Sequence, residues 1–133
     1  MAKQTGLGWS TLDVDDSAGT AQDIREDVNS MTFSTPRNVA EVTGIDKNAV
    51  ERLLLLADFS ISMSGTFDDD TSDSVHDVAA VLDNQRTITI VVSGQTLANE
   101  CLLTDYALNR QADGQLTFTL PGVLADGTVP VWS

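Results

Sequence analysis

The stretch Phe59-Ser60-Ile61-Ser62-Met63-Ser64-Gly65-Thr66-Phe67 decides the fold, because large apolar side chains alternate along it with serine and threonine. Successive side chains of a β-strand point to opposite faces, so a period of two predicts a strand with one buried and one solvated face. The same period occurs in Arg86 to Val92 and in Gln115 to Leu120. The three segments together predict a mainly β protein.

Further strands are predicted on both sides of these segments. Trp9 to Val14 and Val28 to Thr35 have the composition of strands, and the turn residues Asp15 to Gly19 separate them. Ala98 to Asn109 is a longer strand candidate with mixed faces. The turn-forming residues Arg110 to Gly114 follow it, so we expect a hairpin between this strand and the next.

One segment has the period of a helix. Its apolar residues recur at i, i+3, i+4 and i+7, namely Val75, Val78, Ala79 and Leu82. Ser72 is the expected N-cap, and Asp73 lies in the expected first turn, where a negative charge is favourable. We therefore expect one short helix that packs on the sheets.

Residues 36–57 form a long excursion between strands. Asn48 to Leu56 fits an amphipathic turn of helix, but Leu53 to Leu56 fits an extension of the following strand equally well, and both alternatives stay open. Connections of this length in compact domains are usually functional or disordered. The leucines lack an evident place in a small core, which indicates a surface that docks on another protein.

Length and charge bound the possible functions. A chain of 133 residues is long enough for one domain, which we assign to 1–133. Its 20 acidic and seven basic residues give a net charge of −13, which disfavours tight binding of nucleic acid. Cys101 is the only cysteine, so an internal disulfide is excluded. No apolar run is long enough for a membrane span, and no export signal is evident, so we expect synthesis in the cytoplasm.

Catalytic and metal-binding motifs are not evident. The acidic run Asp68 to Asp73 suggests calcium, but the EF-hand loop needs Gly at its sixth and Glu at its twelfth position, where this chain has Asp73 and Ala79. His76 is the only histidine, which rules out a histidine-based metal site. We expect His76 to be an exposed helix residue and Cys101 a small residue of the core, and we expect no catalytic residue, metal or cofactor.

The order of these elements resembles the tail tube (major tail) proteins of long-tailed bacteriophages over nearly the whole chain. The resemblance is carried by Val14-Asp15-Asp16-Ser17-Ala18-Gly19-Thr20, Glu41-Val42-Thr43-Gly44 with Glu51, Asp58 through Asp69, Thr104-Asp105-Tyr106, Asp113-Gly114-Gln115-Leu116-Thr117 and Asp126-Gly127-Thr128-Val129-Pro130-Val131-Trp132. It implies a β-sandwich or distorted barrel of two packed sheets, with one short flanking helix and a long inter-strand loop.

The resemblance also implies an assembly. Hexameric rings stack into a hollow tube with an acidic lumen that conducts DNA during ejection, and four strands of each subunit join those of its neighbours in one wall. The residues that would face the lumen are Ser60, Ser62, Ser64, Thr66, Glu100, Gln115, Thr117 and Thr119. The residues of the inter-subunit loop would be Arg37, Val42, Ile45, Lys47, Arg52, Leu54 and Leu55.

The implied partners follow from this role. They are further copies of the chain and other tail proteins, namely the tape measure, the tail terminator, and the baseplate or tip. DNA would pass without specific binding, and acids on or beside the wall strands would repel it; these are Asp58, Asp68, Glu100, Asp105 and Asp113. No membrane is involved. The protein would be part of the virion tail, assembled in the host cytoplasm.

Two other functions compete with this one. A small accessory or decoration protein of the virion, or a carbohydrate-binding β-sandwich, is the alternative, although Phe59, Phe67 and Phe118 fall in core positions and leave few aromatic residues for a sugar platform. A hydrolase is a more distant alternative, because carboxylate pairs arise by composition in a chain with 16 Asp. The net charge of −13 would also be explained by solubility alone.

Overall fold

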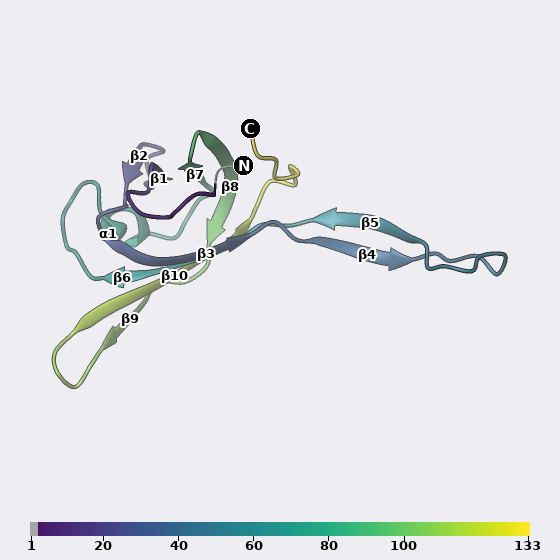
Figure 1. Ribbon diagram of the computed structural model, residues 1–133. Helices are drawn as coiled ribbons and strands as arrows, with labels where there is room; N and C mark the ends of the chain where they lie inside the picture. The colour runs from purple at the N-terminus through teal and green to yellow at the C-terminus, as the bar shows by residue number, and fades with distance from the viewer. Residues whose placement is uncertain (1–2) are drawn as a thin grey trace.

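The computed structural model describes residues 3–133 and is mainly β, as the sequence predicts. Its elements are β1 (Thr11–Asp15), β2 (Ala21–Asp23), β3 (Val28–Ser34), β4 (Arg37–Glu41), β5 (Arg52–Ala57), β6 (Ser60–Thr66), α1 (Val75–Ala79), β7 (Arg86–Val92), β8 (Gln95–Leu103), β9 (Ala107–Arg110) and β10 (Leu116–Leu124). Figure 1 shows a curved body from which β4 and β5 extend as a long arm.

The body is built on one antiparallel sheet of eight strands. Its order is β2-β1-β7-β8-β10-β6-β3, and β9 pairs with the first half of β10. The sheet is not closed, since β2 and β3 lie at its two ends. It is bent, with β1, β7 and β8 on one side of the core and β3 and β6 on the other (Figure 1). The second sheet consists of β4 and β5 alone.

The core lies inside the bend and has the period that the sequence predicts. Alternate residues of the predicted strands are buried, among them Ile61, Met63, Ile88, Ile90, Phe118 and Leu120. Val75 and Val78 of α1 pack against them, and Cys101 is buried as expected. Each large apolar side chain removed from water in this way stabilises the fold by about 1.5–3 kcal/mol.

Gly65 permits a close approach of two strands. The register of β3 against β6 shifts between Val28 and Ser30, which brings the backbone before β3 against β6. A Cβ atom at Gly65 would lie 1.9 Å from the carbonyl oxygen of Asp27. Only glycine fits here without displacing backbone.

The helix begins later than the sequence predicts. Its N-cap is Ser74, whose hydroxyl accepts a hydrogen bond from the Asp77 amide, so the prediction of Ser72 is wrong. Leu82 lies beyond the end of α1 and is exposed. The prediction that His76 is exposed is also wrong, because its ring is half-buried against Phe67 and Tyr106.

Arg86 is a buried structural residue that the sequence pattern does not reveal. Its side chain is 1% exposed and donates to the carbonyl oxygens of Val78 at 2.7 Å and Asp15 at 3.1 Å. It also donates to the carbonyl oxygen of Val81 and to the Asp83 carboxylate. Charged donors of this kind satisfy carbonyls that a helix end leaves free, so Arg86 joins the end of α1 to β1 and β7.

The predicted strand at 98–109 and the ambiguous segment at 48–56 both contain strands, but the prediction of one continuous strand at 98–109 is wrong. Residues 98–109 are two strands, β8 and β9, separated by Thr104 to Tyr106, and β9 forms the predicted hairpin with β10. Arg52–Ala57 is strand rather than helix, and it pairs with β4. The excursion at 36–57 is therefore a β-hairpin, which we call the arm.

Candidate assembly surfaces

The outer side of the sheet carries a row-by-row array of short polar side chains. Registered pairs place Ser30, Ser64 and Thr119 side by side, and Thr32 beside Ser62. We call this surface the hydroxyl face; it consists of Ser30, Thr32, Ser34, Ser60, Ser62, Ser64, Thr66, Thr117 and Thr119. Ala107 and Asn109 extend it onto β9. None of these strand positions carries a charge.

Most of the residues predicted to face a lumen lie on this face. Ser60, Ser62, Ser64 and Thr66 of β6 and Thr117 and Thr119 of β10 are brought together there. Gln115 is exposed in the turn immediately before β10. Glu100 lies apart on β8, where it is half-buried, accepts a hydrogen bond from the Thr87 hydroxyl, and lines a groove of about 480 Å³ under the C-terminal segment.

The residues that the sequence analysis expects to face a lumen do not include those of β3, although β3 contributes to the hydroxyl face. The signal for it is present in the chain, since Ser30-Met31-Thr32-Phe33-Ser34 alternates as clearly as β6 does. Met31 and Phe33 pack on the core, so Ser30, Thr32 and Ser34 face outward.

The acidic residues lie around the hydroxyl face rather than on it. Asp58 precedes β6, Asp68 follows β6, Asp105 precedes β9, and Asp113 lies in the turn between β9 and β10. A negative potential is therefore concentrated in the loops at the ends of the strands, while the strands themselves present neutral hydroxyl groups.

The two strands at the borders of the hydroxyl face, β3 and β9, each have a free edge. β3 pairs only with β6, and β9 pairs only with β10, so each leaves a row of backbone N–H and C=O groups without strand partners. The order β3-β6-β10-β9 is antiparallel throughout, so β3 and β9 run in opposite directions. A free edge is a template for pairing with another chain.

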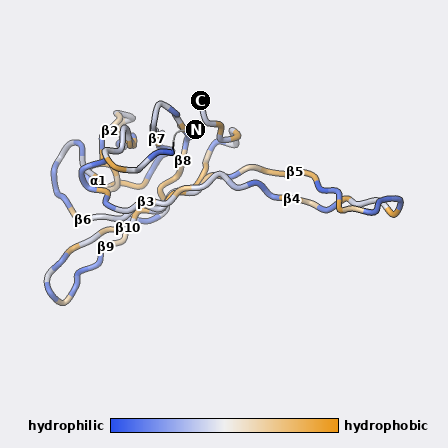
Figure 2. Tube along the Cα trace, in the orientation of Figure 1, coloured by the Kyte–Doolittle hydropathy of each residue, from blue (hydrophilic) through white to orange (hydrophobic). Residues whose placement is uncertain are grey.

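The arm exposes apolar side chains over its length. All seven residues predicted for the inter-subunit loop lie in it: Arg37, Val42, Ile45, Lys47, Arg52, Leu54 and Leu55. Figure 2 shows hydrophobic segments along both strands of the arm, far from the body. Leu54 is 65% exposed and Leu56 80%. Alternate residues of a strand point to opposite faces, so Leu53 and Leu54 give the ribbon two apolar faces.

The arm also differs from the body in charge. It holds three of the seven basic residues, Arg37, Lys47 and Arg52, and three of the 20 acidic residues, Glu41, Asp46 and Glu51. The arm is therefore neutral, and the remainder of the chain carries the whole net charge of −13. Because the arm has no net charge, it adds no net electrostatic repulsion to a contact with another acidic surface.

A cluster of titratable groups lies where α1 meets the sheet. Asp27 is 6% exposed and accepts a hydrogen bond from the Val75 amide at 2.9 Å. Burial, with the Asp68 carboxylate nearby, raises the pKa of Asp27 to about 6. The His76 Nδ1 and the Tyr106 hydroxyl are 3.3 Å apart, and burial raises the pKa of Tyr106. These contacts connect the helix to the sheet.

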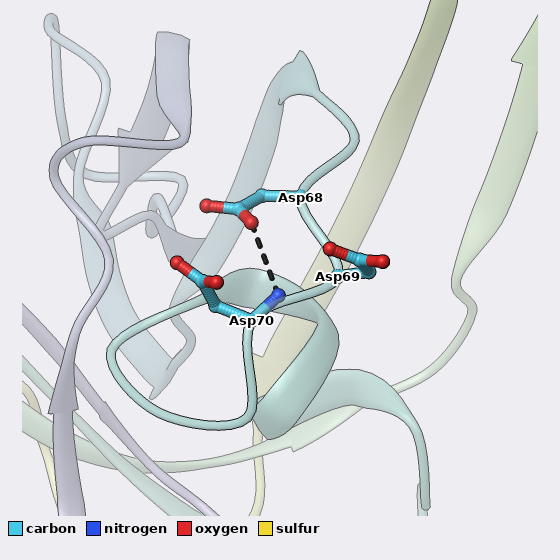
Figure 3. Close-up of side chains that lie close together, drawn as sticks. All are labelled: Asp68, Asp69 and Asp70. Carbon is cyan, nitrogen blue, oxygen red and sulfur yellow. Dashed lines mark hydrogen bonds between the residues drawn. The ribbon is translucent and has the colours of Figure 1, made fainter.

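The acidic loop before α1 is the candidate cation site within residues 3–133. The carboxylates of Asp68, Asp69 and Asp70 have oxygen atoms within 4.8 Å of one another. Figure 3 shows that the Asp68 carboxylate accepts a hydrogen bond from the Asp70 amide, at 3.0 Å. This is the bonding of an Asx turn, which stabilises a loop without an ion.

The pKa of the single cysteine determines whether it can act as a nucleophile. Burial raises the pKa of the Cys101 thiol to about 12, so the thiolate that a nucleophile requires is not populated near neutral pH. Among the residues the structure describes, no helix has the length and apolar character needed to cross a membrane.

Comparison with solved structures shows where this architecture occurs. A chain of the tail of an empty gene transfer agent (GTA) particle with C6 symmetry superposes with a TM-score of 0.75 and 17% sequence identity, over 98% of each chain. The chain has the fold of a GTA tail subunit. A chain in the virion of the native GTA particle has a TM-score of 0.73 and 15% identity, over 98% of this chain and 99% of that one. No family model or curated protein matches the sequence.

The match to a GTA tail subunit spans the body and the arm alike, since 98% of the chain is covered. It confirms the resemblance to tail tube proteins at the level of the fold. At 17% identity the similarity concerns the fold alone.

Proposed function

We propose that this protein is the structural, non-catalytic subunit of a phage-like tail tube. Six copies form a ring, and rings stack into a hollow tube that conducts DNA during ejection. The observation that carries the proposal is the pair of free edges on β3 and β9, which flank the hydroxyl face. The sixfold symmetry of the similar GTA tail supports the number of copies.

The strand directions support closure of such a ring. In a ring with rotational symmetry every copy keeps the same orientation, so β9 of one copy meets β3 of the next. These strands run in opposite directions, and the new pair is antiparallel like every other pair in the sheet. Closing the sheet around the axis removes the free edges.

The hydroxyl face becomes the wall of the lumen. Serine and threonine offer no cation to phosphate, so DNA in transit forms none of the counterion-releasing contacts that lysine and arginine make. Acidic residues such as Asp58 and Asp113 border the wall and keep the lumen acidic, because they repel phosphate along its edges.

The arm docks on other copies, in the same ring or in the adjacent one. Its two exposed apolar faces support this role, because an isolated two-stranded ribbon is marginally stable in water. The ends of the tube contact other tail proteins, such as a tape measure, a terminator, and a baseplate or tip. The protein resides in the virion tail, and it is assembled in the host cytoplasm.

Electron microscopy of the concentrated protein tests this function. We expect rings or tubes with sixfold symmetry and a hollow centre. A monodisperse monomer at every concentration, and also in the particle from which the chain derives, would contradict the proposal and favour an accessory or carbohydrate-binding module.

A further inference from the structure

The open side of the bent sheet contains a groove that the core does not fill. The groove lies between the segment that precedes β1 and the free edge of β3, and its volume is about 250 Å³. Trp9, Leu12, Val28 and Met31 give it apolar walls. We call it the seam groove. An apolar groove beside a free strand edge is suited to a side chain carried by an added strand.

An acidic hollow of about 450 Å³ adjoins the seam groove, since Trp9 and Arg25 line both. Asp23, Glu26 and Asp73 contribute its carboxylates. Arg25 is bound to Asp23 at 2.8 Å, whereas Glu26 forms no ion pair with a described residue.

The side chains that line this hollow have an excess of negative charge, because three carboxylates face one guanidinium. The hollow is therefore a place where an additional cation is favourable.

β9 carries the complementary side chains on the face opposite to the hydroxyl face. Leu108 pairs with Phe118 in register, but it lies beyond the core and is 49% exposed. Arg110 follows two residues later on the same face, is exposed, and forms no ion pair with a described residue. One strand thus presents an apolar side chain and a cation without partners.

Strand direction determines which feature each side chain meets. When β9 pairs antiparallel with β3 of the next copy, its inner face continues the inner face of β3, where Val28 and Met31 line the seam groove. In this pairing, β9 of the first copy runs from Leu108 to Arg110 toward the N-terminal end of β3 in the next copy. Glu26 lies at that end, two residues before the strand begins.

We propose that Leu108 of one copy fills the seam groove of the next copy, and that Arg110 of the same strand binds Glu26 beside it. This inference rests on the ring proposed above and names the residues that select the contact between neighbours. The backbone pairing of β3 and β9 joins the copies, while the apolar contact and the ion pair fix which strand docks and in which direction.

Charge reversal tests the ion pair. Arg110→Glu places two carboxylates together and should raise the protein concentration needed for assembly by about tenfold or more. Glu26→Arg alone should act similarly, and the double variant should restore assembly. Sedimentation and electron microscopy measure assembly, and circular dichroism verifies that each variant folds.

Matched variants separate the ion pair from net charge. Lys3→Glu changes the net charge as Arg110→Glu does and should leave assembly unchanged. Asp69→Arg combined with Arg110→Glu has the wild-type net charge and should not restore assembly. Restoration by Asp69→Arg, or failure of Glu26→Arg to restore it, would overturn the pairing.

Leu108→Ser tests the apolar half of the contact. Because Leu108 lies outside the core, we expect a folded protein whose assembly is weakened, whereas Leu108→Met should assemble normally. If the wild-type protein forms rings and both Leu108→Ser and Arg110→Glu do so equally well, this contact is wrong and the tube proposal stands. If the wild-type protein forms no rings, the tube proposal fails and this inference fails with it.

Discussion

The body and the arm of this protein differ in whether their apolar side chains are buried. The body buries sixteen hydrophobic residues inside its bent sheet, and none of these residues comes from the arm. The arm exposes its leucines and valines on both faces, and Ile45 at its tip is fully exposed. The body thus contains the interactions that fold the subunit, whereas the arm contains interactions that only another molecule completes.

Charge separates the same two regions. The body carries the net charge of −13 and the arm is neutral. Like-charged bodies repel one another, so a surface without excess charge favours contact between copies. The arm provides such a surface, and the difference teaches that the apolar side chains that fold the subunit and those left for assembly lie mostly in separate parts of one small chain.

The largest expected effect comes from adding one methyl group to the body. Gly65→Ala places a Cβ atom 1.9 Å from the Asp27 carbonyl oxygen and should cost at least about 3 kcal/mol, because backbone has to move. Gly44→Ala in the arm is the control, since its Cβ would meet only the mobile Asp46 carboxylate. Thermal unfolding measures both. Equal melting temperatures for the two variants would contradict the assignment of stability to the body.

The next comparison uses leucines from the two regions. Leu120→Ala removes a fully buried side chain and should lower the free energy of unfolding by about 2–5 kcal/mol. Leu54→Ser with Leu55→Ser should leave the melting temperature of the free subunit nearly unchanged and abolish tube formation. Circular dichroism and electron microscopy measure the two properties. Unfolding of the arm variant would show that these leucines belong to the core.

The third prediction concerns pH and the body alone. The pKa of Asp27 is about 6 when the protein is folded and is lower when it is unfolded, so the folded state holds the proton more tightly. The free energy of unfolding therefore falls as pH rises from about 4 to about 6, by up to about 3 kcal/mol from this residue, and is level above.

Asp27→Asn is the matched variant for this effect, because the amide oxygen still accepts the hydrogen bond from Val75. Its unfolding free energy, measured in urea at pH 4.5 and pH 7, should fall less than that of the wild type over this interval. A wild-type and a variant protein with the same pH dependence would show that Asp27 titrates normally.

Removal of the C-terminal segment should have a smaller effect on stability. Unlike the arm, this segment packs on the body, where Ser133 and Thr96 exchange two backbone hydrogen bonds and Trp132 contacts Phe33. Deletion of residues 129–133 should cost about 1–2 kcal/mol of stability. Unchanged thermal unfolding would show that the segment is free in solution.

Substitutions on the hydroxyl face should change the stability of the subunit least of all. Ser62→Lys changes an exposed position, so the subunit should fold and form tubes normally, with Ser62→Gln as the neutral control. Lysine in the lumen should make the tubes retain short double-stranded DNA in a salt-dependent manner. Tubes of both variants that release DNA equally would place Ser62 outside the lumen.

The sequence predicts the body well because burial there follows a simple period. Ile61 and Met63 alternate with serine because one face of β6 is buried and the other is solvated, and the same cause makes β7 and β10 recognisable. The hydroxyl face follows from that alternation. The alternation from Ser30 to Ser34 predicts its extension onto β3 in the same way.

The sequence predicts less about segments that are not buried within the subunit, because burial of one face is what imposes a period. Leu53 to Leu56 are all exposed, so neither a helical nor a strand period is required of them and the pattern stays ambiguous. The sequence does not identify the N-cap because Ser72 and Ser74 have the same capping chemistry, and in the structure the Ser74 hydroxyl accepts the hydrogen bond from the Asp77 amide. The burial of Arg86 depends on carbonyl groups from two separate parts of the chain, β1 and the end of α1.

Hydrogen exchange of the arm amides tests the central claim most directly. We expect the amides of Arg52–Ala57 to exchange rapidly in the free subunit, at nearly the unfolded rate, while those of β6 and β7 are protected, and we expect the arm to become protected when tubes form. Protection of the arm already in the monomer, or its continued exchange within assembled tubes, would contradict the account.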